Sequence, residues 1–376
     1  MSTLNNNISL FFSLTFRGRK RFFWCGFLSL MLLACNSDSD KAIITSPDAP
    51  LLKVEFSSHA LDGFVINRLL ADEYGVYAAT DRGLFYSANS ENWQLFTSSD
   101  WDVLDIISLN ADHLMMTILS RGQYQLVETL DRGITWQFIE HNFGGTFAKE
   151  NEEINRLQWD PESQVLYAVG IDVLAKSEDQ GRYWQVLSGH WKSFGSGMSA
   201  VTYSAVYPTI FYGGQGAIEN PILRRVNIND SSEDLIDVSH LLPSPSTVEE
   251  VRFDVVDPAT VYVAGEGGVI KSKDMGDTWE PLLTNHNSRF YFDLIQDPAS
   301  PTTFYTAGWN KAFNEPQSLV FEVSLDSGLT WEQFQHPDLA LFGGVRTMAL
   351  VQSETETTVY LGLYKGGVMA VDVTVE

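Results

Sequence analysis

The chain has 376 residues, of which 44% are hydrophobic and 19% are charged, and its formal net charge is −24. This acidity excludes nucleic acid and anionic lipid surfaces as preferred partners. Both cysteines, Cys25 and Cys35, lie near the N-terminus. The remainder therefore has no thiol for a disulfide, a thiolate metal site or a cysteine nucleophile.

The first 34 residues are expected to be an export signal. Residues 1–21 contain four bases and no acid, and an apolar run follows from Phe22 to Ala34. This run is too short to span a bilayer but has the length of a signal-peptide core. Its end, Leu32-Leu33-Ala34-Cys35, resembles the lipobox of bacterial lipoproteins, which implies cleavage before Cys35 and lipidation of that residue. The alternative is an ordinary signal peptide with a chance cysteine.

Residues 35–50 are expected to form a disordered tether, because they are polar and include Ser, Asp and Pro. Asn36 follows the cysteine where Asp would stand, and in enterobacteria-like sorting this implies export to the outer membrane. Removal of the signal takes away four positive charges and no negative one, which leaves a net charge of about −28. We expect an exported protein whose contact with the membrane is through lipid alone.

Four copies of the pattern S/T-x-D-x-G-x-T/Y-W lie between strand-like runs, at Thr129–Trp136, Ser177–Trp184, Ser272–Trp279 and Ser324–Trp331. The Asp can accept hydrogen bonds from N–H groups two or three residues on, and the Gly supplies a positive φ. The Trp begins the next strand and is large enough to seal a joint between repeats. A catalytic or calcium-binding role for the Asp residues is the alternative, but each lies on a separate repeat.

This pattern resembles the Asp-box (BNR) repeat of sialidase-like and sortilin-like β-propellers. The resemblance implies that the turns lie on the face away from the functional site and act structurally. The residues expected to build them are Asp131, Gly133, Trp136, Asp179, Gly181, Trp184, Asp274, Gly276, Trp279, Asp326, Gly328 and Trp331.

Repeat counting predicts an all-β fold, a seven-bladed β-propeller of four-stranded antiparallel blades over residues 51–376. The Asp residues of the four motifs are separated by 48, 95 and 52 residues, so one copy is missing between Asp179 and Asp274. Degenerate copies lie at Ser87–Trp93 and around Asn229–Glu233, and each unit has the length of one blade. The last unit has three strands, so we expect Leu51–Phe56 to supply the fourth and to close the ring.

The candidate ligand-binding residues fall in two groups. The innermost strands contribute arginines, and a lining of these could hold a carboxylate through the bidentate guanidinium. Loops on the face opposite the repeat turns hold aromatic residues that could stack on sugars or anchor peptides. The two groups are Arg68, Arg156, Arg252 and Arg346, and Trp101, Trp191 and Trp309. The alternatives are pairing of the arginines with Glu152, Glu153, Glu249 and Glu250, and aromatic plugging of the channel mouth.

Six of the seven histidines recur in the links between blades: His59, His141, His190, His240, His286 and His336. A shared metal site would need them far closer together than the outer strands of a propeller allow. Inheritance through the repeats explains their spacing more simply. The sequence predicts no metal and no cofactor.

The sequence leaves two classes of function open, a glycan-active protein and a module that binds proteins or peptides. The chain lacks the Arg-Ile-Pro motif of sialidases, and it has one propeller where xyloglucanase-like glycosidases pair two. A hydrolase would need a carboxylate pair; Asp102, Asp105, Glu152 and Glu249 are available, and nothing selects a pair among them. The chain is more similar to non-catalytic sortilin-type ectodomains and photosystem assembly factors. This implies a lipid-anchored envelope module that recognises a protein or peptide. The alternative is a glycoside hydrolase or glycan-binding protein.

Overall fold

The computed structural model describes residues 51–89, 91–145, 152–191, 197–285, 289–353 and 356–375. The chain divides into two units, Met1–Ala49 and Pro50–Glu376. The expected signal peptide, Cys35 and the tether therefore lie outside the described residues. The described part contains no helix with the length and hydropathy to cross a membrane.

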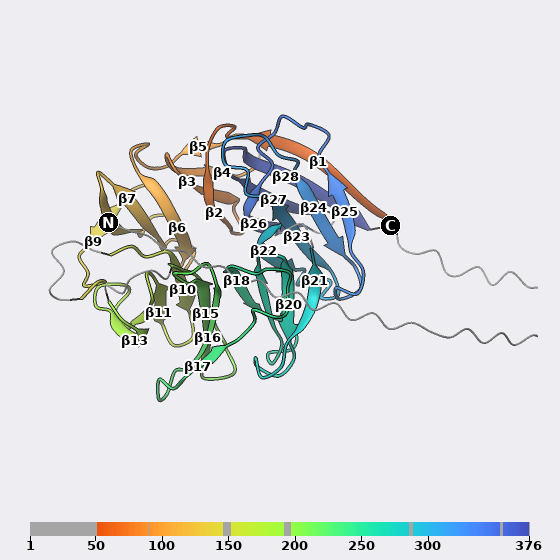
Figure 1. Ribbon diagram of the computed structural model, residues 1–376. Coiled ribbons are helices and arrows are strands. Elements are labelled where there is room, and N and C mark those ends of the chain that lie inside the picture. Colours follow the sequence, from red (N-terminus) through yellow and green to blue (C-terminus); the bar gives the residue numbers. More distant parts are fainter. Residues whose placement is uncertain are drawn as a thin grey trace, which may run out of the picture. The chain divides into compact units, whose positions relative to one another are not determined.

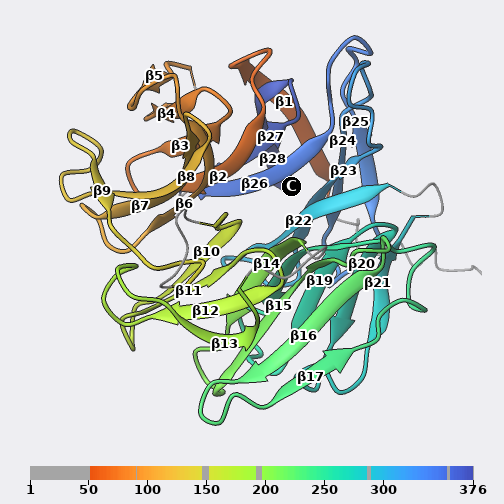
Figure 2. The same ribbon diagram turned by 60° about the vertical axis from the view of Figure 1, so that its left-hand side comes forward.

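Seven four-stranded antiparallel sheets form the second unit, and they surround a common axis (Figures 1 and 2). This confirms the predicted all-β, seven-bladed propeller. In the first six blades the strands follow chain order from the axis outward. Blade one comprises β2 (Ile66–Ala71), β3 (Val76–Thr80), β4 (Gly83–Ser87) and β5 (Gln94–Leu95); blade two β6 (Asp102–Ser108), β7 (Leu114–Ser120), β8 (Gln123–Thr129) and β9 (Gln137–Ile139); blade three β10 (Arg156–Asp160), β11 (Val165–Val169), β12 (Val173–Ser177) and β13 (Gln185–Gly189).

The same order continues through the second half of the ring. Blade four comprises β14 (Gly197–Tyr203), β15 (Thr209–Gln215), β16 (Pro221–Asn227) and β17 (Glu233–Ile236); blade five β18 (Val248–Phe253), β19 (Val261–Gly265), β20 (Gly268–Ser272) and β21 (Glu280–Thr284); blade six β22 (Phe290–Gln296), β23 (Phe304–Trp309), β24 (Val320–Ser324) and β25 (Glu332–Gln335); blade seven β26 (Val345–Gln352), β27 (Thr357–Leu363), β28 (Gly367–Val375) and β1 (Leu52–Ala60).

The ring closes through β1, the first strand of the propeller, which runs beside the last strand, β28 (Figure 1). Leu52 pairs with Val375 and Ala60 with Val368, so the predicted closure is confirmed. The strand runs four residues beyond the predicted end at Phe56. Ser57, Ser58 and His59 are all polar, so the apolar–polar alternation that marks a strand in sequence stops at Phe56, which explains the early predicted end.

The repeat turns use the Asp more tightly than expected. In the first copy Asp131 Oδ1 accepts the N–H of Thr135 at 2.8 Å, and Oδ2 accepts its hydroxyl at 2.6 Å. The bonds therefore come from four residues on. Arg132 and Gly133 have φ of 58° and 90°, and two successive left-handed residues curl the chain back onto the Asp. The same two Asp–Thr bonds recur at Asp274 and Asp326.

The motif tryptophans lie at the joints between blades. Trp136 donates its indole N–H to Phe96 O in the preceding blade at 3.2 Å, and Trp331 donates to Leu282 O at 3.3 Å. Each apolar cluster of the core likewise draws on neighbouring blades; one joins Tyr77 and Leu84 of blade one to Ile106 of blade two. Burial between blades, at about 1.5–3 kcal/mol for each large aliphatic side chain, therefore holds the ring together.

The two faces of the ring differ in what they carry. The first and third turns of each blade share one face: Met275 N in a repeat turn donates to Ala259 O in the neighbouring strand one–two turn at 2.9 Å. We call this the turn face. The opposite face carries the strand two–three turns and the links between blades, and we call it the link face.

Candidate functional site at the central channel

The innermost strands share an irregularity that sets the channel lining. Six of the seven have a register shift against the second strand at the same place, for example between Ile66 and Arg68, and between Val248 and Glu250. Such a bulge places an extra residue on one strand and re-aims its side chain. The residues after the shift form a ring around the channel. They are Arg68, Asp105, Ala200, Glu250 and Thr347; in blade six Asp293 lies within a wider shift between Tyr291 and Leu294, and in blade three Arg156 opens a strand that has no shift.

One side of this ring centres on Asp105, a fully buried carboxylate. Its Oδ1 lies 3.3 Å from Arg156 Nη1 and 3.6 Å from Arg68 Nε. Its Oδ2 accepts the N–H of Leu157 in the next blade at 2.7 Å. Asp105 therefore joins three blades through one side chain.

Asp293 occupies the corresponding place on the other side. Its Oδ1 accepts Arg252 Nε at 2.9 Å, and Oδ2 accepts the N–H of Met348 in the next blade at 3.1 Å. Glu250 links the two halves, because Arg68 reaches across the channel to its Oε2 at 3.2 Å. We call the set of Arg68, Arg156, Arg252, Asp105, Glu250 and Asp293 the ionic ring.

Opposite charges within the ionic ring offset the effect of burial on the pKa values of its members. Burial alone would lower the pKa of Arg68, but Glu250, Asp105 and Asp293 raise it above its usual range. Burial would raise the pKa of Glu250, but Arg252, Arg68 and Arg156 lower it below its usual range. The arginine and carboxylate side chains of the ring thus lie in contact with partners of opposite charge, which is the condition under which buried charges are tolerated.

Arg346 has a different environment from the other three predicted arginines. Its Nη1 donates to Asn67 Oδ1 at 3.2 Å, its Nε is buried without a partner, and burial lowers its pKa. Among the described residues no carboxylate lies within ion-pair distance of it. Its guanidinium lies 5.9 Å from the centre of the Phe292 ring, on the link-face side of the ionic ring.

Aromatic rings and cations gather at this end of the channel, on blades six and seven. Trp309 contacts Phe292 at 5.2 Å and Phe313 at 5.0 Å, and it stacks on Tyr364 at 5.4 Å between ring centres. Cations accompany the rings: Lys311 lies 3.5 Å from the centre of Phe290, and Lys365 donates to Phe313 O at 2.8 Å. We call Phe290, Phe292, Trp309, Phe313, Tyr364, Lys311, Arg346 and Lys365 the aromatic–cation cluster.

Two carboxyl groups face this cluster. Burial raises the pKa of Glu249 to about 7, although a hydrogen bond from Thr247 and the nearby charges of Arg346, Arg156 and Lys311 oppose the rise. Burial also raises the pKa of Asp102, which accepts a hydrogen bond from Asn67 Nδ2 at 3.0 Å. A carboxyl group with this pKa is partly protonated at neutral pH, in contrast to the neighbouring Glu250, whose pKa is lowered.

The predicted tryptophans do not meet. Trp101 packs edge-on against Phe138 at 5.8 Å in the joint between blades one and two. Trp191 packs against Phe143 at 4.8 Å in the joint between blades two and three. Trp309 ends strand β23, not the following turn as predicted, and it is buried over Gly344. Only Trp309 therefore shares a site with a predicted arginine, Arg346.

The histidines have separate surroundings. His59 Nε2 lies 2.6 Å from Gly366 O, and His336 Nδ1 accepts the N–H of Asp338 at 3.1 Å. Burial lowers the pKa of His141 to about 4, so it is neutral at physiological pH. His286 lies outside the described residues. Within the described residues, no group of three His, Cys, Asp or Glu side chains could hold a metal ion.

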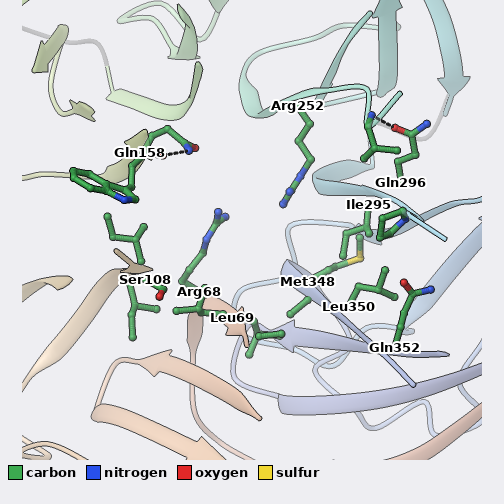
Figure 3. Close-up of a pocket in the computed structure, with 18 of the residues that line it drawn as sticks. Arg68, Leu69, Ser108, Gln158, Arg252, Ile295, Gln296, Met348, Leu350 and Gln352 are labelled. Carbon is green, nitrogen blue, oxygen red and sulfur yellow. Dashed lines mark hydrogen bonds between the residues drawn. The ribbon is translucent and has the colours of Figure 1, made fainter. Parts of the chain in front are cut away.

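A cavity of about 620 Å³ lies at the turn-face end of the channel. Arg68 and Arg252 point into it from opposite sides, as Figure 3 shows. Its walls are mostly apolar, and its rim includes the exposed residues Pro161, Val255 and Pro298 of three strand one–two turns. We call this cavity the chamber. Arg68 and Arg252 belong to the arginine lining that the sequence predicts for the channel, but the aromatic binding loops are predicted on the opposite face.

Several cluster and chamber residues were missed from the sequence. Tyr364 and Lys365 lie in a short strand two–three turn of blade seven, and Lys311 lies in the long corresponding turn of blade six. Adjacent blades bring these turns together, so the repeat alignment contained the signal. The chamber wall residues Leu70, Ile107 and Ile295 are also aligned across the repeats, but they read as ordinary strand positions.

Comparison with known proteins shows the fold alone. No protein-family model and no curated sequence matches the chain. The GH74 enzyme of Niastella koreensis has a TM-score of 0.60 at 18% identity, over 84% of this chain and 53% of that chain. The GH74 xyloglucanase from Xanthomonas campestris gives 0.61 at 15% identity, over 85% and 53%. The structure of YCF48 bound to D1 peptide gives 0.59 at 14%, over 88% and 97%.

The chain thus spans about half the length of the GH74 enzymes that it resembles and nearly the whole length of YCF48. All of these identities are low, so the likeness establishes a β-propeller and leaves both function classes open.

Proposed function

We propose that the protein is a non-catalytic binding or assembly module, lipid-anchored at Cys35 to a bacterial outer membrane, which recognises a protein or peptide through the link face. The repeat turns belong, in this proposal, to the Asp-box class. The aromatic–cation cluster carries the proposal. In a protein of net charge −24, cations and aromatic rings gather at one end of the channel, and such side chains dominate many protein interfaces.

The accessibility of the cluster supports recognition of a partner. Phe313 is 47% exposed although it packs against Trp309 and Tyr364, and Lys311 is exposed. An exposed aromatic side chain on a buried aromatic base resembles an anchor surrounded by complementary charge. The partner surface that fits is acidic with an apolar side chain. The peptide complex of YCF48 shows that a single propeller of this kind can bind a peptide.

The test is a pull-down from envelope extract with the propeller, residues 51–376, followed by cross-linking to locate the contact. We expect Lys311→Glu together with Lys365→Glu to abolish capture of the partner, because both changes reverse charge beside Phe313. Arg121→Glu is the matched control, since Arg121 lies in the strand two–three turn of blade two on the same face. Loss with both variants, or retention with both, would contradict the proposal.

A glycoside hydrolase is the second candidate, and Glu249 is the observation that favours it. A carboxyl group with a pKa of about 7 is suited to general acid catalysis. Of the other carboxylates considered, Asp105 has both oxygens engaged in the ionic ring, whereas Asp102 faces the same end of the channel as Glu249. Hydrolysis of xyloglucan or another glycan by wild type, abolished in Glu249→Gln, would replace the binding proposal with this one.

A further inference from the structure

The chamber has the size and construction of a small-molecule site, and it is separate from the aromatic–cation cluster. Its volume of about 620 Å³ falls within the range of roughly 300–1,000 Å³ that such sites occupy. Its lining combines apolar residues with six polar or charged ones, Arg68, Ser108, Gln158, Arg252, Gln296 and Gln352. The apolar wall residues are Leu70, Ile107, Ile295, Met348 and Leu350. A second cavity of about 320 Å³ shares Arg252, Val255 and Ile295 and extends the space toward blade four.

The polar base presents hydrogen-bond donors. Arg68 uses Nε toward Asp105 and Nη1 toward Glu250, and Arg252 uses Nε and Nη2 toward Asp293. Among the described residues, Nη2 of Arg68 and Nη1 of Arg252 have no partner. Figure 3 shows both guanidinium groups ending in the same space. Two N–H groups from opposite walls can therefore converge on one acceptor.

The ionic ring contains equal numbers of cations and anions, but this does not cancel the preference of the chamber for an anionic ligand. The arginines and the carboxylates of the ring differ in how far they are exposed to the chamber. The side chains of Arg68 and Arg252 are 20% and 38% exposed, whereas those of Asp105, Glu250 and Asp293 are 0%, 7% and 1% exposed. A molecule in the chamber meets the guanidinium edges and not the carboxylates. Guanidinium groups bind carboxylates with charge-assisted hydrogen bonds.

We propose that the chamber binds a monocarboxylate with an apolar body, with the carboxylate on Arg68 and Arg252 and the apolar body against Ile295, Met348 and Leu350. The apolar wall residues favour such a ligand over an inorganic anion, which has no apolar surface to bury. Free apolar acids and the carboxyl ends of apolar peptides share this chemistry. The chamber opens among the strand one–two turns, so it can be filled while the link face holds a partner.

The test is isothermal titration calorimetry with residues 51–376, which contain every described strand of the closed ring. The probes are octanoate, its neutral isostere octanamide, the tripeptide Ala-Leu-Leu with a free carboxylate, and the same tripeptide as its C-terminal amide. We expect at least one free acid to bind about tenfold or more tightly than its amide, since a guanidinium group forms stronger hydrogen bonds with a charged carboxylate than with a neutral amide. Preference for octanoate identifies a free acid as the source, and preference for the tripeptide identifies a chain end.

Variants locate the binding. Ala71→Phe places a ring in the chamber without touching the ionic ring, and we expect it to abolish binding of the preferred acid. Ala299→Phe is the matched control, because Ala299 is exposed on the same face outside the chamber. Ser108→Phe, on another wall, replaces Ala71→Phe should that variant fail to fold. Equal affinity for acid and amide, no binding of any probe, or binding unchanged by the chamber-filling variants would overturn the proposal.

Discussion

The ionic ring and the aromatic–cation cluster place arginines from equivalent inner strands in opposite situations. Arg156 in the ring has a buried carboxylate, Asp105, at 3.3 Å. Arg346 in the cluster has an amide oxygen on one nitrogen and a buried Nε without a partner. Arg156 is paired with a carboxylate of a neighbouring blade and stabilises the fold, whereas Arg346 has no carboxylate within ion-pair distance among the described residues and keeps hydrogen-bonding capacity unused. Unused capacity on a buried cation is the feature that marks a binding site, and residue type alone does not.

The largest expected effect is on the ring. Asp105→Ala removes the partner of Arg68, Arg156 and the N–H of Leu157 together. We expect a loss of about 3–5 kcal/mol in the free energy of unfolding, because Arg156 loses its counterion, Arg68 keeps only Glu250, and the buried N–H of Leu157 loses its acceptor. Urea unfolding measures it. Asp112→Ala, at an exposed position in a turn of the same blade, should change stability by less than about 0.5 kcal/mol. Similar losses of unfolding free energy in both variants would show that the contacts of Asp105 in the ionic ring do not stabilise the fold more than an exposed turn residue does.

The comparison between the arginines is tested directly by substituting each in turn. Arg156→Gln should lower the free energy of unfolding by about 2–3 kcal/mol, because the buried Asp105 then keeps only one ion pair, the longer one with Arg68, beside its hydrogen bond from Leu157 N–H. Arg346→Gln should change stability by less than about 1 kcal/mol, since burial already disfavours this charge and no carboxylate pairs with it. Equal losses of free energy of unfolding, measured with urea, would mean that Arg346 stabilises the fold as much as Arg156 does.

Glu249 should make stability depend on pH. Its pKa is about 7 when folded and about 4.5 when unfolded, so the folded protein holds a proton that the unfolded chain releases. Stability should therefore fall as pH rises from about 4.5 to 7 and stay level above. Partial exposure reduces the expected loss to about 1–2 kcal/mol. Glu249→Gln should remove this slope from urea midpoints measured between pH 4.5 and 8, and parallel profiles would show that Glu249 titrates normally.

The fold was predictable from the sequence because it is repeated. Four motif copies and two degenerate ones fix the blade length, and Leu52–Ala60 is the strand left over. The site was only partly predictable. Glu249 is the extra residue of the bulge between Val248 and Glu250, and the sequence does not show which residue of a strand is bulged, so it could not assign Glu249 to the cluster and Glu250 to the ring. The chamber depends on where Arg68 and Arg252 end in space, which repeat alignment does not contain.

The smallest expected effect concerns the repeat turns, which lie outside both regions. Hydrogen bonds from the Thr278 hydroxyl and N–H and from Ser272 lower the pKa of Asp274 to about 2. Its contribution to stability is complete above the ordinary pKa of about 4 and is lost as pH falls toward 2.

About half of this contribution should be gone at pH 3, so the difference in urea midpoint between wild type and Asp274→Asn should shrink to about half between pH 6 and pH 3. Asp112→Asn, which leaves the repeat turns intact, serves as the control and should show a constant, small difference. Because Asp131 and Asp326 make the same bonds, one substitution removes only one of several equivalent turns. A difference for Asp274→Asn that does not change with pH would show that the turn depends on the geometry of the Asp side chain and not on its charge.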